Sequence, residues 1–221
     1  MTADKASRIE ALRREAADCR ACPLWRNATQ TVFGEGPADA DILLVGEQPG
    51  DREDRAGQPF VGPAGAMLDR ALDEAGIDRR RAYVTNAVKH FKFEPRGKLR
   101  LHKKPNAGEI NVCKRWLLRE IDVLKPRIIA ALGATAAQSL VGRPVAIGAN
   151  RGRTLILPDG LRVFVTIHPS SLLRLPDKAD RWNAYTRFVE DLRNLAGGGR
   201  GRLGGPLLRN SDKLTAPRCG D

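Results

Sequence analysis

Three short groups of polar residues could carry out chemistry, and each directly follows an apolar run of the kind that forms a buried strand. They are Gly46-Glu47-Gln48-Pro49-Gly50-Asp51, then Thr85-Asn86, then His168-Pro169-Ser170-Ser171. The first group lacks the lysine and the glycine spacing of the common phosphate-binding loops, and its two carboxylates would repel a phosphate. We therefore expect it to perform acid–base or electrostatic chemistry on another kind of group.

Cysteines and a histidine form a second set of candidates, for a metal centre. Cys19 and Cys22 make a CxxC pair that precedes the first strand, unlike a thioredoxin-type dithiol. A zinc ribbon would need a second CxxC about 15–20 residues further on. Together with Cys113, the pair favours an iron–sulfur cluster. The fourth ligand is either His90 or Cys219, and the ordering entropy of the tail favours His90. Alternatively, Cys113 is a buried apolar residue.

A basic segment covers residues 89–104, with seven Lys and Arg residues against Glu94 alone, a net charge of +6. Phe91 and Phe93 lie among the charges, a composition that suits contact with a nucleic-acid backbone. His102 lies inside this segment, where the surrounding cations favour a neutral imidazole that could act as nucleophile or base. The alternatives are a solvated charged loop and a histidine that only contacts phosphate.

Composition points to a polyanionic partner. The chain has 221 residues, 42% of them hydrophobic, and a formal net charge of +12. Nucleic acid is the first expectation and an anionic membrane surface the second, whereas a generally basic proteome would explain the charge without any partner. No run approaches the roughly 20 apolar residues of a membrane span, and the N-terminus has no apolar secretory region. We expect a soluble, cytoplasmic monomer.

Apolar and helical patterns alternate along the chain and position these groups. Strands are expected at 41–45, 82–88, 127–132 and 162–167, and helices at 64–75, 108–124, 134–141 and 181–195. Residues 154–157, before the Asp159-Gly160 turn, form a hairpin with the last strand. This order predicts an α/β fold with a mostly parallel four-stranded sheet flanked by helices. The polar groups should converge at the carboxyl edge of that sheet. One domain, 1–196, precedes a basic tail, 197–221, expected to be disordered.

These motifs together resemble the uracil-DNA glycosylase superfamily, and more narrowly the iron–sulfur-containing UdgX-type enzymes, relatives of the family 4 glycosylases. The resemblance is carried by the CxxC pair, GEQPGDRED from Gly46, QPFVGPAG from Gln58, YVTNAVKHFKF from Tyr83, Cys113 and HPSSLLR from His168. Ordinary family 4 enzymes have alanine where this chain has Gln48, and cysteine where it has His90. The loop of the UdgX group reads KRRIH, whereas residues 98–102 read KLRLH, so that Leu99 replaces an arginine.

The resemblance implies a three-layer glycosylase fold that cleaves the N-glycosidic bond of uracil in DNA, with single-stranded DNA preferred. Phe60 would stack on uracil, Asn86 would read its O4 and N3–H, and His168 would stabilise O2 of the departing base. Glu47 or Asp51 would stabilise positive charge on the sugar. The implied substrate-binding residues are Gly46, Gln48, Pro49, Gly50, Phe60, Asn86 and Ser170, and the implied DNA-backbone contacts are Lys89, Lys98, Arg100, Lys103 and Arg174.

The UdgX group also implies a covalent step, in which His102 captures the sugar C1′ and Glu47 accepts the other imidazole proton. The implied cluster is [4Fe-4S], held by Cys19, Cys22, His90 and Cys113. Two other functions fit the same residues. One is a conventional glycosylase that turns over, and the other is a non-catalytic protein that binds DNA lesions.

Overall fold

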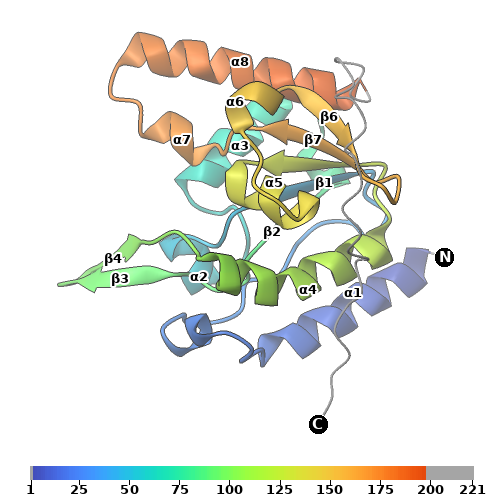
Figure 1. Cartoon of the computed structure of the whole chain (residues 1–221), viewed down its shortest axis with the longest axis vertical. Helices are drawn as coiled ribbons and strands as arrows, with labels where there is room; N and C mark the ends of the chain where they lie inside the picture. Colours follow the sequence, from blue (N-terminus) through green and yellow to red (C-terminus); the bar gives the residue numbers. More distant parts are fainter. Residues whose placement is uncertain (1, 198–221) are drawn as a thin grey trace.

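Four of the predicted strands form the parallel centre of the fold, and a fifth strand extends it. The computed structural model describes residues 2–197. The parallel strands are β1 (Ile42–Gly46), β2 (Ala82–Asn86), β5 (Ile128–Leu132) and β7 (Arg162–Thr166). The order across the sheet is β2-β1-β5-β7-β6 (Figure 1). The expectation of four strands is wrong by one, because the hairpin strand β6 (Arg153–Ile156) pairs antiparallel with the free edge of β7.

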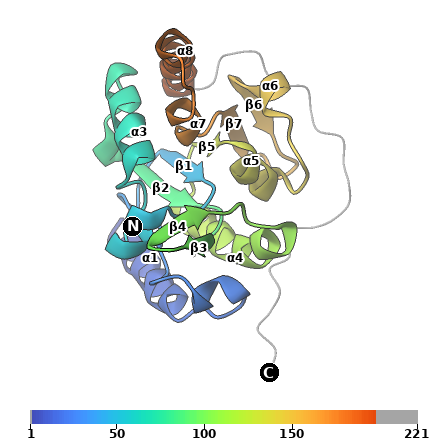
Figure 2. The same cartoon turned by 90° about the vertical axis from the view of Figure 1, so that its left-hand side faces the viewer.

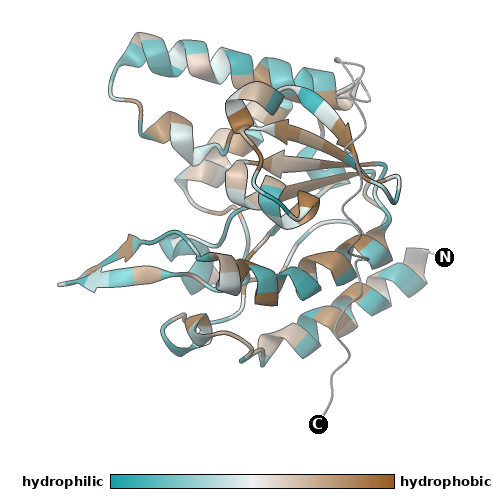
Figure 3. Ribbon diagram, viewed as in Figure 1, coloured by the Kyte–Doolittle hydropathy of each residue, from teal (hydrophilic) through white to brown (hydrophobic). Residues whose placement is uncertain are grey.

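Helices cover both faces of the sheet, which explains why the central strands are apolar on both sides. One layer contains α1 (Thr2–Ala17), α4 (Ala107–Leu124) and α5 (Ala134–Val141), and the other contains α3 (Pro63–Glu74), α7 (Ser170–Leu173) and α8 (Lys178–Ala196). Figures 1 and 2 show the sheet between these layers, and Figure 3 shows its largely hydrophobic strands. Leu43 and Val45 pack into one core and Leu44 into the other, as the alternation of a strand requires.

Short elements complete the described chain. They are α2 (Asp51–Ala56), α6 (Ile147–Asn150) and the 3-10 turns Pro23–Arg26 and Arg79–Arg81. No helix in the described part of the chain is long and apolar enough to cross a membrane. The predicted tail, with Cys219, lies outside the described residues except for Gly197, so the predicted domain boundary stays a prediction.

The basic segment, expected to be a loop, contains a two-stranded antiparallel hairpin of β3 (Phe93–Arg96) and β4 (Leu99–His102). Gly97 has φ +58° at the turn, a conformation that glycine adopts without strain. The hairpin projects from the same end of the molecule as α7 (Figures 1 and 2). After it, the Asn106 side chain and Glu109 form a reciprocal capping box that starts α4. His102, the last residue of β4, therefore lies a few residues before a fixed helix start.

A buried ion pair joins the segment after β2 to α4. Lys89 is 0% exposed, and its Nζ lies 2.6 Å from Glu120 Oε2, 2.6 Å from Thr85 Oγ1 and 2.9 Å from the carbonyl oxygen of Asn86. Glu120 also accepts hydrogen bonds from Gly34 N and the Tyr83 hydroxyl. The expectation that Lys89 contacts the DNA backbone is wrong, because this side chain has no access to solvent.

We predict that Glu120→Ala lowers the free energy of unfolding by about 3–5 kcal/mol, because it leaves the Lys89 ammonium buried without a counter-charge. The double variant Lys89→Met/Glu120→Leu removes both charges and should lose less. Urea unfolding at constant m-value measures both. A loss for Glu120→Ala no larger than that of the double variant would contradict this view of the pair.

Candidate active site

The carboxyl edge of the parallel sheet brings together residues from four separate segments. Glu47 follows β1, Asn86 ends β2, His168 follows β7, and His102 ends the hairpin. The Nε2 atom of His102 lies 3.5 Å from Glu47 Oε1, and the Phe60 and His168 rings are 6.1 Å apart between centroids. Residues up to 121 positions apart in the sequence therefore line one site.

Gly46 leaves open the space between Phe60 and Asn86. A Cβ atom at this position would lie 2.3 Å from Asn86 Oδ1 and 2.7 Å from Phe60 Cζ, so any side chain would displace both. Phe60 itself has φ +58°, an unusual conformation for a large residue. Its carbonyl oxygen packs against Gly65, where a Cβ would lie only 1.7 Å away. The strained backbone at Phe60 thus holds the aromatic ring opposite the end of β2.

The Asn86 amide is available for recognition. The residue is buried, yet no group in residues 2–197 makes a hydrogen bond to its side chain. Its backbone carbonyl, by contrast, accepts from Lys89 Nζ, which fixes the end of β2. A buried, positioned amide without a protein partner offers one donor and one acceptor to a planar ligand.

His168 is a neutral hydrogen-bond donor. The backbone N–H of Ser170 donates to His168 Nδ1 at 3.2 Å, and Ser170 Oγ lies 2.8 Å from the same atom. Because Nδ1 accepts, the proton of the neutral ring lies on Nε2. Burial, with smaller contributions from the nearby Arg174 and His102, lowers the pKa of His168 to about 4. Near neutral pH, this ring therefore offers an N–H group without a positive charge.

The two predicted carboxylates have different surroundings. Glu47 faces His102 with one oxygen and accepts a hydrogen bond from Thr135 Oγ1 with the other. Asp51 instead accepts hydrogen bonds from Arg55 and Arg100. Burial alone would raise the pKa of Asp51, but these two arginines outweigh it and lower the pKa. Glu47 is thus the carboxylate beside the imidazole, and Asp51 holds the hairpin.

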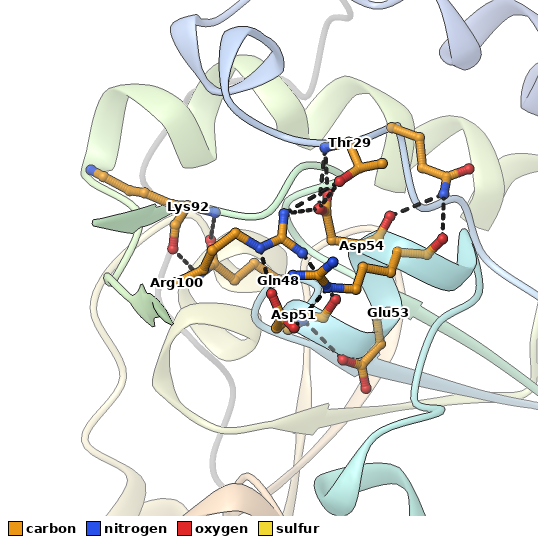
Figure 4. Close-up of polar contacts among 10 residues, drawn as sticks. Thr29, Gln48, Asp51, Glu53, Asp54, Lys92 and Arg100 are labelled. Carbon is orange, nitrogen blue, oxygen red and sulfur yellow. Dashed lines mark hydrogen bonds and ion pairs between the residues drawn. The ribbon is translucent and has the colours of Figure 1, made fainter. Parts of the chain in front are cut away.

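Gln48 closes the base of the hairpin (Figure 4). Its Nε2 donates to the carbonyl oxygens of Lys92 at 3.2 Å and Lys103 at 3.0 Å, and the Lys92 N–H donates to its Oε1 at 3.1 Å. Lys92 precedes β3 and Lys103 follows His102. One side chain therefore joins the loop after β1 to both ends of the hairpin, and the alanine of ordinary family 4 enzymes could not make these bonds.

Arg100 fastens the hairpin to α2. Besides Asp51, its guanidinium contacts Asp54 Oδ2 at 2.6 Å (Figure 4). Its Cζ atom also lies 5.4 and 5.0 Å from the ring centroids of Phe91 and Phe93. Asp54, which is fully buried, also accepts from the N–H and hydroxyl of Thr29. The expectation that Arg100 contacts the DNA backbone is therefore wrong, because its guanidinium is engaged inside the protein.

The other predicted backbone contacts lie at the surface. Lys98 and Arg174 are exposed, and Arg174 Nη1 lies 3.3 Å from Ser170 Oγ. Lys103 is exposed and pairs with Glu94 at 2.6 Å. Pro49 is buried, and Gly50 caps α2, where its N–H donates to Glu53.

The three predicted cysteine ligands lie where the end of α1 meets α4. Cys22 and Cys113 are buried, Cys19 is half-buried, and all three belong to one packed cluster. Burial raises the pKa of Cys22, and it raises that of Cys113 to about 12. His90 Nε2 lies 2.9 Å from Thr31 Oγ1. Within residues 2–197, no three Cys, His, Asp or Glu side chains are grouped as ligands of a metal ion.

Arg115 and Trp116 accompany the thiols. Arg115 Nη2 and Trp116 Nε1 donate to Cys19 Sγ at 3.3 and 3.2 Å, and the Lys89 N–H donates to Cys113 Sγ at 3.2 Å. The Nε atom of Arg115 is buried without a hydrogen-bond partner in the described residues. This pocket therefore supplies several donors to sulfur and retains one unused donor.

Sequence reasoning missed the residues that hold the site. Thr135, Glu53, Asp54 and Glu120 each bond a predicted residue or its loop, yet none was assigned a role. Glu53 and Asp54 end the GEQPGDRED motif, whereas Thr135 and Glu120 stand in none of the quoted motifs. Thr135 could have been found, since it follows β5 at the same edge of the sheet. The anchoring roles of the other three were not predictable, because acidic residues within helices usually face solvent.

An aromatic ring, an amide without a protein hydrogen-bond partner among the described residues and a neutral imidazole meet at the carboxyl edge of a parallel sheet, where open α/β folds bind their ligands. Together these groups suit a planar polar ligand. The sequence pattern of the Uracil DNA glycosylase superfamily matches residues 33–193, and the chain belongs to this superfamily.

Relatives carry the same family name. A type-4 uracil-DNA glycosylase of Thermotoga maritima is 41% identical over 186 residues, which cover 83% of this chain and 91% of that protein. A type-4 enzyme of Pyrobaculum aerophilum is 33% identical over 88% of this chain and 96% of its own length. A type-5 uracil-DNA glycosylase of the same organism is 28% identical over 68% of this chain and 72% of its own.

We predict that the His168 ring stays neutral, with its proton on Nε2, until the pH falls to about 4, as ¹⁵N NMR of the ring nitrogens would show. An unfolded histidine titrates near pH ~6.5, so the unfolded chain binds more protons between these two values. Wild type should therefore lose stability relative to His168→Asn as the pH falls through this window, and not above it. Titration of the folded ring near its unfolded value would contradict the assignment.

Proposed function

We propose that this protein excises uracil from DNA, preferring single strands, and becomes covalently linked to the exposed sugar through His102. The observation that carries the proposal is the pairing of a half-exposed imidazole, 52% accessible, with the Glu47 carboxylate beside the pocket. The names of the relatives support the class of substrate.

Base recognition follows from the pocket. A uracil flipped out of the strand would stack on Phe60, and the Asn86 amide would donate to O4 and accept from N3–H. Cytosine presents the opposite donor and acceptor pattern and would be rejected. The Nε2–H of His168 would donate to O2 and stabilise the uracil anion as the C1′–N1 bond breaks. A neutral His168 suits this role, because the donor strengthens its hydrogen bond as negative charge develops.

In the covalent step, one bond to C1′ breaks and one bond to C1′ forms. The electron pair of the C1′–N1 bond leaves with uracil, and a ring nitrogen of His102 donates its lone pair to C1′ of the oxocarbenium-like sugar. The remaining imidazole proton passes to Glu47, which Thr135 orients from its other side. The new N–C1′ bond has no stable anionic leaving group, so the adduct persists and each protein molecule acts once.

Gln48 supports the UdgX-type assignment over an ordinary type-4 enzyme. Its three hydrogen bonds to the hairpin base hold His102 against Glu47, and this hairpin is what an enzyme with the histidine nucleophile requires. A conventional turnover glycosylase would need no imidazole in this position. A protein that only binds lesions would need no carboxylate paired with it.

The thiol pocket fits an iron–sulfur cluster held by Cys19, Cys22, Cys113 and His90. A cluster spreads its ligands over several iron atoms, so they need not converge as they do around one ion. Its negatively charged sulfur atoms would accept a hydrogen bond from the unpartnered Arg115 Nε. When bound, it would act structurally, joining the end of α1 to α4 and to the chain beyond β2. His90 would have to exchange its contact with Thr31 for iron.

We predict that His102→Ala abolishes the covalent adduct and restores repeated release of uracil, because water can then reach C1′. The measurement is a denaturing gel of the protein mixed with a labelled single-stranded oligonucleotide containing one uracil, with free uracil quantified in the same samples. Trp182→Ala, an exposed residue of α8, is the matched control and should form the adduct normally. Thymine in place of uracil should give neither signal.

An adduct that persists in His102→Ala would exclude the nucleophile assignment. Wild type that releases uracil over many turnovers without an adduct would identify a conventional glycosylase. Uracil-dependent binding with neither product would identify a lesion-binding protein.

We predict that Cys113→Ser lowers the bound iron and the visible absorbance of the purified protein, because it removes a thiolate ligand. Cys219→Ser, which changes the fourth cysteine of the chain, is the matched control and should retain both signals. Full iron in Cys113→Ser, or loss of iron in Cys219→Ser, would overturn the proposed ligand set.

A further inference from the structure

The two faces of the hairpin differ sharply. In β3 and β4, side chains alternate between faces, so Phe93, Pro95, Arg100 and His102 share one face. That face is fastened to the protein through Arg100, as described above, and it carries the imidazole. We call the opposite face, made of Glu94, Arg96, Leu99 and Leu101, the outer face.

The outer face presents apolar side chains to water. Leu99 is 65% exposed and Leu101 is 38% exposed, although both belong to a residue type that is usually buried. They stand two residues apart on β4, so they form one continuous apolar strip. The hairpin has no need of them for its own anchoring, which relies on Arg100 and Gln48. Burial of these two side chains by a ligand would therefore be favourable.

The positive charge around the strip favours an anionic ligand. Arg96, Lys98 and Lys104 are exposed beside the two leucines, whereas the acidic Glu94 is already paired with Lys103. A ligand with alternating anionic and flat apolar parts matches cations that flank leucines. An unpaired DNA strand has this composition, because its phosphates alternate with bases whose faces are apolar. A second copy of this basic chain would bring further positive charge.

We propose that the strip of Leu99 and Leu101 binds the face of an unpaired base next to the uracil nucleotide. Leu99 is three residues from His102 on β4, or roughly 10 Å at about 3.3 Å per residue. Because β4 is an edge strand of a two-stranded sheet, a DNA strand that passes over this edge from the imidazole would bring a nearby nucleotide to the outer face. The inference rests on the proposed function, since the uracil at His102 sets the register of the strand. It gives the hairpin a second role, in which it selects single strands because paired bases hide their faces.

The test is a double-mutant cycle between Leu99 and the DNA bases. The probes are single-stranded oligonucleotides with one 2′-fluoro-2′-deoxyuridine, which resists cleavage, and an abasic spacer at one of the two nucleotides on either side. We expect removal of one particular base to weaken binding of wild type about three- to tenfold, the scale of burying part of a leucine. Leu99→Ser should weaken binding of the intact strand equally and be insensitive to that spacer. Fluorescence anisotropy measures each Kd.

Two variants provide controls. Ile156→Ser removes another exposed apolar side chain, 40% accessible, from β6 and should leave every Kd unchanged. Leu99→Lys adds a cation without a flat face: it should bind the intact strand with a steeper salt dependence but lose the sensitivity to the spacer.

Equal spacer sensitivity of wild type and Leu99→Ser at every position would overturn the proposal. So would a wild-type dimer, detected by light scattering, that Leu99→Ser dissociates without changing DNA binding. Ordinary deoxyuridine in the same oligonucleotide tests the proposed function separately. Uracil chemistry without the coupling would refute only the leucine contact, and coupling without uracil chemistry would refute only the enzyme assignment.

Discussion

The Lys89 ammonium, enclosed without access to water, is the interaction on which much of the site depends. Removing two charges from water costs several kcal/mol per ion unless hydrogen bonds complete their surroundings. Here Thr85, Asn86 and Glu120 supply those bonds, and Glu120 in turn holds Gly34 and Tyr83. The pair therefore fixes the end of β2, where Asn86 begins the pocket, relative to α4, where Cys113 lies. Recognition of the base and the thiol pocket share one support.

A second constraint is that the hairpin must be held without consuming His102. Anchoring falls to Arg100, Asp51, Asp54 and Gln48, which engage the inner face and base of the hairpin. This leaves Glu47 as the partner of the imidazole and divides two carboxylates four residues apart between structure and chemistry. The acidic loop after β1 therefore supplies both Asp51, which anchors the basic hairpin, and Glu47, the proposed base.

The pocket itself is arranged before any ligand arrives. Phe60 is kept in a strained backbone conformation by close packing on Gly65, and Gly46 keeps the space beside it open. His168 is neutral near neutral pH because desolvation lowers its pKa, and its tautomer is set by the Ser170 N–H. Such preorganised donors act without reorganising as charge develops on a departing group.

Periodicity and punctuation in the sequence by themselves determined the helices α3, α4, α5 and α8 and the parallel strands. They also placed Glu47, Asn86 and His168 together, because the carboxyl ends of parallel strands share an edge. Only the tertiary structure decided which charges remain available. Lys89 and Arg100 look like neighbouring phosphate contacts in the chain, yet Glu120 and the Asp51–Asp54 pair, distant in sequence, take them inside. Local patterns fix backbone conformation, whereas the partner of a long charged side chain depends on which segments the fold brings within hydrogen-bonding distance.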